Sequence, residues 1–407
     1  MKKKKREVRF RHHFITRMIL PIVRFFIKRS FRLKIKQYKA LKNKGPFIVL
    51  GNHTVNEDPI VMGLMFPFHL YYIATEQVFN LGFLSKVLRY IVNPIKKAKS
   101  VSDIETIRKT KRIVQEGGSI GIFPEGNTSI NGETSKLQKS TVKLIRLLKL
   151  PVIIINTKGF YLTHPRWSIY RKKGPTTAFI KKIITPEIYE NWSDADFYEV
   201  LKDELYVNAY EDQALMNAHY KGKHIAHGLE KLIFIDLDHN VPFVTYSDGN
   251  ELKSKISDFK LTYLTTGRVR LQNGSVKTLI ELDRLVKLKY FSFYQTCKDS
   301  CLFEEAVVVQ ESFTYYKKHL GQFKLALHKD ALILTNETSS FNWSFDEVIS
   351  VAMQGKYQII IYMDQATYIV RLDPYSSIYK YVLTYQYYKY IQSGGTSIND
   401  NDYDFGI

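Results

Sequence analysis

Cysteine is scarce in this sequence of 407 residues, where only Cys297 and Cys301 occur. Two thiols are too few for a disulfide framework or, by themselves, for a metal site, so we interpret both as reduced thiols of a cytosolic protein. Long apolar runs are also absent, because no stretch approaches the ~20 apolar residues that span a bilayer. No cleavage site of small residues follows the N-terminal apolar segments, which argues against a secretory signal.

Acidic residues are scarce in one part of the chain. Residues 1–50 contain 17 lysines and arginines against a single acid, Glu7, and the whole chain has a formal net charge of +21. Apolar runs at 18–23 and 25–27 lie among these basic residues. This mixture is typical of a helix in the membrane interface, where each Lys or Arg near an anionic leaflet contributes roughly 1 kcal/mol. We therefore expect residues 1–45 to form a basic amphipathic segment on a membrane surface with anionic lipids.

Two other interpretations of the basic segment are weaker. One is a solvated basic tail that docks on its own domain, but such a tail needs no run of Ile, Val and Phe. The other is a nucleic-acid binder, which would spread its charge over a folded face, whereas the body of this chain is close to neutral. We expect no nucleic-acid partner and a peripheral or monotopic protein at the cytoplasmic face of the cell membrane.

The pattern of apolar residues divides the chain into two halves. The first half predicts an α/β domain, with strands at 46–50, 70–75, 119–123 and 151–156 and helices at 59–66, 103–116 and 135–148. Beyond about residue 225, short strands are expected at 321–328, 331–336, 341–345, 357–363 and 366–372, and a final helix at 375–392. These strands and the helix resemble a pleckstrin-homology-like barrel, a pattern that many β modules share.

A histidine followed five positions later by an aspartate is the first candidate for chemistry. His53 and Asp58 come directly after an apolar run, and Gly51-Asn52 supplies a turn. Five positions on a regular helix correspond to about 140° of rotation, so the two side chains meet only if His53 lies in a turn. Pro59 is favoured at the first helical position, with Asp58 as the cap. A neutral imidazole whose other nitrogen is held by a carboxylate can take a proton from an alcohol.

A second motif follows the apolar run at 119–123. Glu125 lies at the junction of strand and loop where α/β folds place ligands, and Gly126 lets the backbone approach a ligand closely. An isolated Pro-Glu-Gly is most often a turn, and a histidine and an aspartate at this spacing are also common by chance. The order of the two motifs favours a site, because both follow apolar runs and are expected to face one cleft.

In these two motifs the chain resembles the glycerophosphate and lysophospholipid acyltransferase family, which includes 1-acylglycerol-3-phosphate acyltransferases. Within this family it resembles a bacterial subgroup with a C-terminal extension. Residues 52–58 match its first block, and residues 123–129, Phe-Pro-Glu-Gly-Asn-Thr-Ser, match its third. Residues 150–153 resemble its fourth block, and residues 94–97 stand where the second is expected. The resemblance covers roughly residues 40–215. It implies transfer of a fatty acyl group from a thioester donor, acyl-CoA or acyl-carrier protein, to a lysophospholipid hydroxyl.

The resemblance also implies roles for the motif residues. His53 would act as the general base on the acceptor hydroxyl, and Asp58 would fix its tautomer and stabilise the imidazolium. Glu125 would position the acceptor or supporting groups, and backbone N–H groups near Gly126 would bind a phosphate or the oxyanion. The alkoxide attacks the acyl carbonyl directly, so no covalent enzyme intermediate, metal or cofactor is expected. The acceptor implied is 1-acyl-sn-glycerol-3-phosphate, giving phosphatidic acid.

Two positions depart from the family pattern. The third block usually has an arginine two positions after its glycine, thought to hold the acceptor's phosphate, and Thr128 stands there. The second block usually has an arginine near Lys96, and lysine lacks the guanidinium fork for a bidentate grip. Candidates to compensate are Lys96, Lys97, Lys136 and Arg166. We expect the substrate to be bound by Glu125, Gly126, Asn127, Thr128, Lys96, Lys97 and Arg166.

The missing arginine leaves a second functional hypothesis open, a catalytically weak or inactive protein that uses the same fold to bind lipid or membrane. The intact pair of His53 and Asp58 favours the enzyme, and Thr128 favours the lipid-binding protein. An acceptor other than lysophosphatidic acid is a further alternative.

The segment after the first domain has a resemblance of its own. Bacterial relatives of the subgroup often carry a zinc ribbon there, and residues 228–239 and 255–258 resemble its flanks without its two Cys-x2-Cys pairs. Without thiolates, structural zinc of that kind is not expected. The expected organisation is a membrane-associating segment at 1–45, an α/β acyltransferase domain at 46–225, a ribbon-like region without metal ligands at 226–300, a β-rich pleckstrin-homology-like domain at 301–395 and a polar tail at 396–407.

Overall fold

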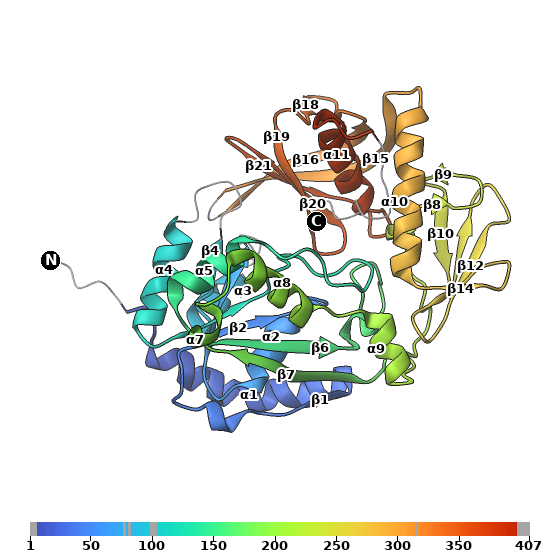
Figure 1. Ribbon diagram of the computed structural model, residues 1–407. Coiled ribbons are helices and arrows are strands. Elements are labelled where there is room, and N and C mark those ends of the chain that lie inside the picture. Colours follow the sequence, from blue (N-terminus) through green and yellow to red (C-terminus); the bar gives the residue numbers. More distant parts are fainter. Residues whose placement is uncertain (1–5, 76–78, 80–82, 98–103, 314–315, 397–407) are drawn as a thin grey trace. The chain divides into compact units, whose positions relative to one another are not determined.

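The structure, a computed structural model, describes residues 6–75, 79, 83–97, 104–313 and 316–396 (Figure 1). By its internal contacts the chain divides into two units. The first unit consists of the chain up to Pro165 together with Lys173–Tyr220, and the second of Arg166–Lys172 together with the chain from Lys221 onward. The polar tail expected at 396–407 lies outside the described residues, apart from its first residue.

The first unit is built on one sheet. In the described part of the chain its strands are β1 (Leu33–Ile35), β2 (Ile48–Gly51), β3 (Leu70–Thr75), β4 (Ile95–Lys97), β5 (Ser119–Ile122), β6 (Val152–Lys158) and β7 (Thr176–Ile184). Their order is β1-β7-β6-β2-β5-β3-β4. Strands β6, β2, β5, β3 and β4 are parallel, whereas β7 runs antiparallel to β6 and pairs in parallel with β1. The carboxyl ends of β2, β4 and β5 therefore lie at the same edge of the sheet, where open α/β sheets place their ligands.

Helices cover both faces of this sheet. They are α1 (Phe10–Phe31), α2 (Asp58–Met65), α3 (Phe83–Ile91), α4 (Ile104–Gln115), α5 (Ser140–Leu148), α6 (Phe160–Thr163), α7 (Pro186–Tyr189), α8 (Asp194–Leu205) and α9 (Ala209–Leu215), with a 3-10 turn at Lys39–Leu41. Apolar side chains of α1 and α2 pack on one face, and those of α4, α5 and α8 pack on the other.

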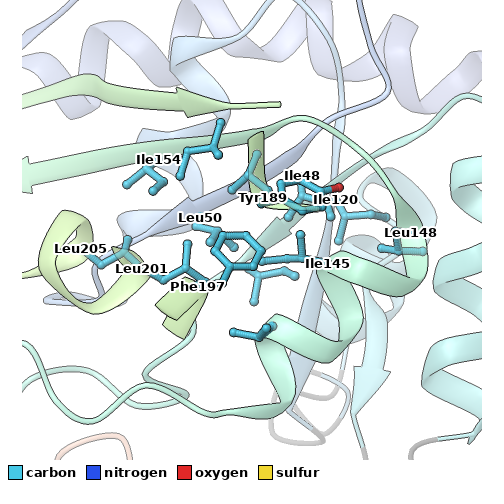
Figure 2. Packing of buried hydrophobic residues seen from close by; sticks show 14 of the residues in the cluster. Ile48, Leu50, Ile120, Ile145, Leu148, Ile154, Tyr189, Phe197, Leu201 and Leu205 are labelled. Atoms are coloured by element: carbon cyan, nitrogen blue, oxygen red, sulfur yellow. The ribbon is translucent and has the colours of Figure 1, made fainter. Parts of the chain in front are cut away.

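Strand β2 shows why the core has two sides. Successive side chains of a strand point to opposite faces. Ile48 and Leu50 point into the cluster that includes Phe197 of α8 (Figure 2), whereas Val49 belongs to the cluster that includes Met62 of α2. All three β2 side chains are fully buried, which explains why the sequence here is a continuous apolar run instead of an alternating one.

The predicted elements of the first half are confirmed, with one clear error in extent. The strand predicted at 70–75 is β3 itself, and the other predicted strands match β2, β5 and β6 within one or two residues. The helix predicted at 135–148 begins only at Ser140. The reason is that Ser135 and Gln138 donate their backbone N–H groups to Glu125 and to the carbonyl of Pro124, which holds this segment as a loop.

Helix α1 presents a large apolar surface to solvent. Its inner side buries His12 and Phe31, and its C-terminal residue, Phe31, belongs to the core. The outward side chains of Phe10, Phe14, Met18, Ile22, Phe25 and Phe26 are between 52% and 81% exposed. Their spacing of three and four residues places them on one face of the helix. Among the described residues, no helix is long and apolar enough to span a bilayer.

The second unit ends in an antiparallel sheet followed by a helix. Its strands, within the described residues, are β15 (Cys301–Ser312), β16 (Lys317–His328), β17 (Ala331–Thr335), β18 (Ser340–Ser344), β19 (Val348–Gln354), β20 (Gln358–Met363) and β21 (Thr367–Arg371), in the order β18-β17-β16-β15-β21-β20-β19. Helix α11 (Tyr379–Gln392) packs on the end of this sheet, where the Tyr385 hydroxyl lies 3.0 and 2.8 Å from the carbonyls of Val348 and Ile349. The β-rich character expected here is confirmed, and β15 and β19 are strands that we did not predict.

The region expected to be ribbon-like contains small strands and one long helix. These are β8 (Ile235–Asp236), β9 (Val241–Pro242), β10 (Thr245–Asp248), β11 (Glu251–Ser254), β12 (Lys260–Tyr263), β13 (Val269–Arg270), β14 (Val276–Lys277) and α10 (Leu279–Thr296). The fully buried Asp236 accepts hydrogen bonds from the Ser257 hydroxyl at 2.6 Å and from the backbone N–H of His239 at 3.1 Å. These bonds join the turn after β8 to the turn after β11. No group of three or more His, Cys, Asp or Glu side chains in the described residues is arranged to hold a metal ion.

Candidate active site

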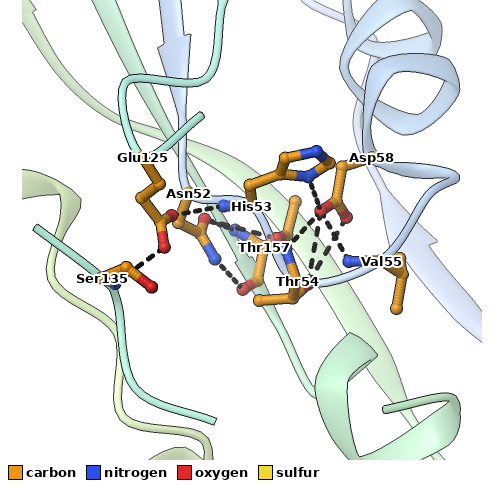
Figure 3. Close-up of polar contacts among 8 residues, drawn as sticks. All are labelled: Asn52, His53, Thr54, Val55, Asp58, Glu125, Ser135 and Thr157. Atoms are coloured by element: carbon orange, nitrogen blue, oxygen red, sulfur yellow. Dashed lines mark hydrogen bonds and ion pairs between the residues drawn. The ribbon is translucent and has the colours of Figure 1, made fainter. Parts of the chain in front are cut away.

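Asn52 extends the pairing of β2 with β6 beyond the last strand residue. Its side-chain Oδ1 accepts the backbone N–H of Thr157 at 2.8 Å, and its Nδ2 donates to the Thr157 carbonyl at 3.1 Å (Figure 3). The amide thus imitates a strand residue while the backbone turns away from the sheet. Asn52 is 1% exposed, so both bonds form in a buried environment. These bonds fix the position at which the loop with His53 begins.

Asp58 holds the imidazole of His53 and the loop between them. Its Oδ2 lies 3.0 Å from His53 Nδ1 and accepts the backbone N–H groups of Thr54 at 2.5 Å and Val55 at 2.9 Å (Figure 3). An ionised carboxylate only accepts hydrogen bonds, so the proton of a neutral imidazole lies on Nδ1 and Nε2 keeps a free lone pair. Asp58 is fully buried, whereas the His53 side chain is 18% exposed.

The predicted capping role of Asp58 is wrong. Glu57 occupies the N-cap position, Asp58 is the first residue of α2, and Pro59 follows it. The Asp58 carboxylate turns back toward Thr54 and Val55 instead of toward the helix, because these N–H groups belong to the tight turn that starts at His53. The predicted proximity of His53 and Asp58 in a turn is confirmed.

Glu125 clamps the backbone on both sides of the loop that follows β5. Its Oε1 accepts the backbone N–H of His53 at 2.6 Å, and its Oε2 accepts that of Ser135 at 2.8 Å. Burial raises the pKa of Glu125 to about 8, although the two N–H donors favour the ionised form and oppose this effect. Each oxygen of Glu125 thus holds one backbone N–H group, and one of these groups is that of His53.

The loop after β5 also returns to the carbonyl of His53. The backbone N–H of Ser129 donates to this carbonyl at 2.8 Å. The Ser129 hydroxyl donates to the carbonyl of Glu133 at 2.7 Å and accepts the N–H of Gly132 at 2.9 Å. The peptide groups on both sides of His53 are therefore bonded to the second motif, which explains how the two motifs form one site.

Gly126 allows the sharp turn at the start of this loop. Its φ is +75°, and its N–H donates to the carbonyl of Phe123 at 3.1 Å. The next two residues, Asn127 and Thr128, are half-buried, and their backbone N–H groups have no acceptor within the described part of the chain. Consecutive unpaired N–H groups after a left-handed glycine can bind an anion.

Of the two lysines in β4, Lys97 is the one tied to this loop. The strand alternation puts Lys97 on the same face as Ile95, which packs in the core cluster of α5, and Lys96 on the opposite face. Lys97 Nζ donates to Gln138 Oε1. The amide of Gln138 covers Gly126 so closely that a Cβ on the glycine would lie 2.5 Å from Gln138 Nε2. The structure thus connects Lys97, through Gln138, to the glycine of the second motif.

Arg166 is not part of the first unit. By its contacts it belongs to the second unit, where its Nε donates to the carbonyl of Gly355 at 3.0 Å. Lys136 lies on the loop before α5 and is exposed. The candidate site of the first unit therefore consists of His53, Asp58, Glu125, Lys97 and the loop from Gly126 to Ser129.

Comparison with known proteins finds a family that matches this part of the chain. Residues 32–158, which contain every residue of the candidate site, match the family described as Acyltransferase. These residues belong to the acyltransferase family. Two curated relatives of this acyltransferase domain are both named 1-acyl-sn-glycerol-3-phosphate acyltransferase. The relative from Borreliella burgdorferi is 28% identical over 128 residues, and that from Saccharomyces cerevisiae is 21% identical over 173 residues.

The matches cover only part of each protein. They include 30% and 40% of this chain, and the chain spans about half the length of the two curated relatives, 50% and 55%. Among solved structures, the 1-acyl-sn-glycerophosphate (LPA) acyltransferase PlsC from Thermotoga maritima has a TM-score of 0.41 and 18% identity, covering 51% of this chain and 84% of that chain. The N-terminal PH domain of human ARAP2 has a TM-score of 0.19 and 8% identity, covering 24% and 89%.

Three further residues contact the site residues, and no role was assigned to them from the sequence. Phe123 stacks on the imidazole of His53, with ring centroids 4.5 Å apart and planes inclined by 28°. Gln138 bridges Lys97 and Gly126, and Ser135 supplies the second N–H donor to Glu125. Phe123 was visible as part of the second motif, but no pattern in the sequence indicated Gln138, since this residue lies in a stretch that was predicted to be helical.

Proposed function

We propose that the protein transfers a fatty acyl group from acyl-CoA or acyl-carrier protein to the free hydroxyl of a lysophospholipid, with 1-acyl-sn-glycerol-3-phosphate as acceptor and phosphatidic acid as product. The observation that carries the proposal is the bond between His53 Nδ1 and the buried Asp58, inside residues that match the acyltransferase family. The names of the two curated relatives support the same acceptor.

In the proposed mechanism His53 is a general base. Its Nε2 takes the proton of the acceptor hydroxyl while the oxygen attacks the thioester carbonyl. The new C–O bond forms, the tetrahedral intermediate collapses, and the C–S bond breaks. The leaving thiolate takes the proton from the imidazolium, so the enzyme returns to its starting state. Asp58, 3.0 Å from Nδ1, stabilises the imidazolium between these two steps. The acyl donor is a co-substrate, and these steps use no cofactor.

We propose that Lys97 and the loop after Gly126 bind the negative charges of the substrate. Lys97 leaves the sheet at the same edge as His53 and Glu125, and Gln138 holds its ammonium group beside Gly126. The backbone N–H groups of Asn127 and Thr128 are suited to the acceptor phosphate or to the oxyanion. A lysine provides a point charge without a bidentate grip, so this site would distinguish phosphate from other anions less sharply than an arginine.

Replacing the base tests the reaction. We expect His53→Ala to lower the rate of thiol release from acyl-CoA by ~10²–10⁴-fold with lysophosphatidic acid as acceptor, because the proton transfer is lost. The exposed His319 of β16 offers a matched control, and His319→Ala is expected to keep wild-type activity. Equal thiol release by wild type and His53→Ala would rule out the catalytic assignment. A wild type that releases no thiol with any lysolipid acceptor would favour the lipid-binding hypothesis.

We propose that α1 attaches the protein to the cytoplasmic face of a membrane that contains anionic lipids. Its outward face combines the six exposed apolar side chains with the exposed basic residues Arg17, Lys28 and Arg29, and the helix contains no acid. An apolar face with basic residues is the pattern of helices that lie in the headgroup region. The inner face of α1 packs on the first unit, so the helix would carry the catalytic domain with it.

Co-sedimentation with liposomes tests this attachment. We expect Phe14→Ser/Ile22→Ser/Phe25→Ser to weaken binding to vesicles of phosphatidylcholine and phosphatidylglycerol by at least tenfold, since each apolar side chain contributes more than 1 kcal/mol when buried. These side chains point away from the core, so the fold is expected to survive. Leu215→Ser, which changes an 83% exposed leucine of α9, is the control. Undiminished binding by the triple variant would remove the anchoring role of α1.

We propose that residues 301–395 have a pleckstrin-homology-like fold and that residues 226–300 form a ribbon-like region without metal ligands. The support for the first is the single series of antiparallel strands from β18 to β19 followed by α11. The support for the second is the pair of turns joined through Asp236 and Ser257. We propose no nucleic-acid partner, because the excess of basic charge is concentrated in the N-terminal segment with its exposed apolar face.

A further inference from the structure

Two side chains hold the imidazole of His53, one at an edge of the ring and one against a face. Asp58 binds the edge through Nδ1, and the ring of Phe123 lies against a face with 4.5 Å between centroids and 28° between planes. Phe123 is the first residue after β5, two positions before Glu125, whose carboxylate holds the backbone N–H of the same histidine. One short segment thus contacts both the backbone and the ring of the proposed base.

The position of the Phe123 ring is determined by its surroundings. It packs against the core cluster between the sheet and α2. A Cβ added to Gly51 would lie 3.3 Å from Phe123 Cε1, 2.9 Å from the terminal methyl of Met62 and 3.1 Å from Ile155. The ring therefore fills the space that the missing side chain of Gly51 leaves open. A side chain packed in this way keeps one orientation, so the histidine stacked on it is held as well.

A stacked aromatic ring acts on a base differently from an aliphatic one of similar size. Both exclude water from the face of the imidazole to a similar extent. Only the aromatic ring presents the negative face of its quadrupole, which attracts a cation. The neutral imidazole becomes an imidazolium during the proposed reaction, so the attraction strengthens as the proton arrives. Asp58, on the edge of the ring, acts in the same direction, and Glu125 also contacts His53, through the backbone N–H of the histidine.

We propose that Phe123 is a positioning residue for the acyl-transfer reaction, which holds the His53 ring toward the acceptor and stabilises the imidazolium through its π face. This inference rests on the proposed function of His53 as the general base. It assigns to the aromatic residue that opens the second motif a role separate from those of Glu125 and Gly126, which act on backbone and substrate.

Two substitutions separate the aromatic face from simple packing. Phe123→Leu keeps an apolar side chain of similar volume without a π face, and Phe123→Tyr keeps the ring. Phe68→Leu is the matched control, because Phe68 is also partly buried against the same core cluster but stacks on Phe47 and Phe66. Activity is measured as thiol release from acyl-CoA between pH 5.5 and 9, with thermal unfolding of each variant followed in parallel.

We expect Phe123→Leu to lower kcat roughly two- to fivefold with a smaller change in KM, from the usual strength of a cation over an aromatic ring. The acidic limb of its pH–rate profile is expected to move by about half a pH unit to lower pH. Phe123→Tyr and Phe68→Leu should both follow the wild-type profile. A Phe123→Leu profile that superimposes on that of the wild type, or an equal displacement in Phe68→Leu, would overturn the proposal.

A spectroscopic measurement tests the stacking without any activity. In protein with ¹³C-labelled histidine, the ring protons of His53, identified by their absence in His53→Ala, are expected to show an upfield ring-current displacement. This displacement should disappear in Phe123→Leu and persist in Phe123→Tyr, including when Phe123→Leu is too unstable for kinetics. Its absence in the wild type would disprove the geometry. Equal activity of wild type and His53→Ala would instead disprove the proposed function.

Discussion

At the scale of single residues, one oxygen of the Asp58 carboxylate binds both the imidazole of His53 and the backbone of the loop. Oδ2 accepts from His53 Nδ1 and from the N–H groups of Thr54 and Val55. Because these two N–H groups both point at the position of Oδ2, only a hydrogen-bond acceptor fits there. The proposed role of Asp58 in catalysis is therefore separable from its role in the turn by the choice of substitution.

Asp58→Asn and Asp58→Ala should differ for this reason. In Asp58→Asn the two backbone N–H groups are expected to hold the amide oxygen at the position of Oδ2, so the tautomer of His53 is kept and only the negative charge is lost. We expect a fall in kcat of about 10²-fold and little change in thermal stability. Asp58→Ala leaves two buried N–H groups unpaired, at about 1–3 kcal/mol each, and should unfold at clearly lower temperature. Equal melting temperatures of the two variants would contradict this argument.

The pairing of His53 with Asp58 could be predicted from the sequence, whereas the contacts of Phe123 and Gln138 could not. His53 and Asp58 could be paired in advance because the five-residue spacing allows contact only in a turn, and Pro59 indicated where that turn ends. The stacking of Phe123 and the bridge through Gln138 depend on how β5 lies beside β2 and on a loop where the sequence reads as helix. Such contacts arise from strand order and packing, which a single sequence does not reveal.

At the scale of elements, the docking of α1 depends on buried imidazoles. His69, at the end of the loop before β3, accepts from the Thr16 hydroxyl at 3.0 Å and donates from Nε2 to the Val92 carbonyl at 3.0 Å. His12 of α1 bonds to the Tyr71 hydroxyl at 3.0 Å, and its ring stacks on that of His69. Burial lowers the pKa of both histidines to about 4, and for His12 the nearby Arg11 and Arg9 lower it further. The N-terminal half of α1 is thus held by neutral imidazoles.

This cluster predicts a loss of stability on acidification. Between pH 6.5 and 4 the unfolded chain binds protons at His12 and His69 that the folded protein does not, so the free energy of unfolding falls as the pH is lowered. His13 and Lys109, which also face the cluster, oppose protonation. We expect a decrease of a few kcal/mol across this range and a smaller decrease in His69→Gln.

Denaturant titrations followed by Trp192 in a Trp167→Phe/Trp343→Phe background report on the first unit, since Trp192 packs in its core. The control variant is His319→Gln, which changes an exposed histidine of the second unit and should keep the wild-type pH dependence. A stability of the first unit that is constant from pH 6.5 to 4 would contradict the assignment of neutral imidazoles at this contact.

At the scale of the whole molecule, the chain passes between its two units more often than the sequence predicts. We expected the acyltransferase domain to be one continuous range, 46–225, whereas residues 166–172 belong by their contacts to the second unit and the first unit continues from Lys173. In that unit the backbone N–H of Ile169 donates to the His227 carbonyl at 3.0 Å, and the buried Lys172 lies 4.6 Å from the centre of the Trp167 ring. Burial and the nearby Lys356 lower the pKa of Lys172 to about 7. The composition of residues 166–172 does not indicate that this short segment belongs to the second unit.

This exchanged segment limits how the protein can be divided or recombined. A chain cut after Tyr220 would keep the whole acyltransferase match but would remove Tyr263, whose ring packs against Trp167 and faces the ammonium group of Lys172. A gene that simply acquired the second unit at its 3′ end would have had to remodel this loop as well. The second unit therefore cannot be exchanged as a simple C-terminal domain. A chimera with another acyltransferase would have to carry residues 166–172 together with everything that follows residue 220.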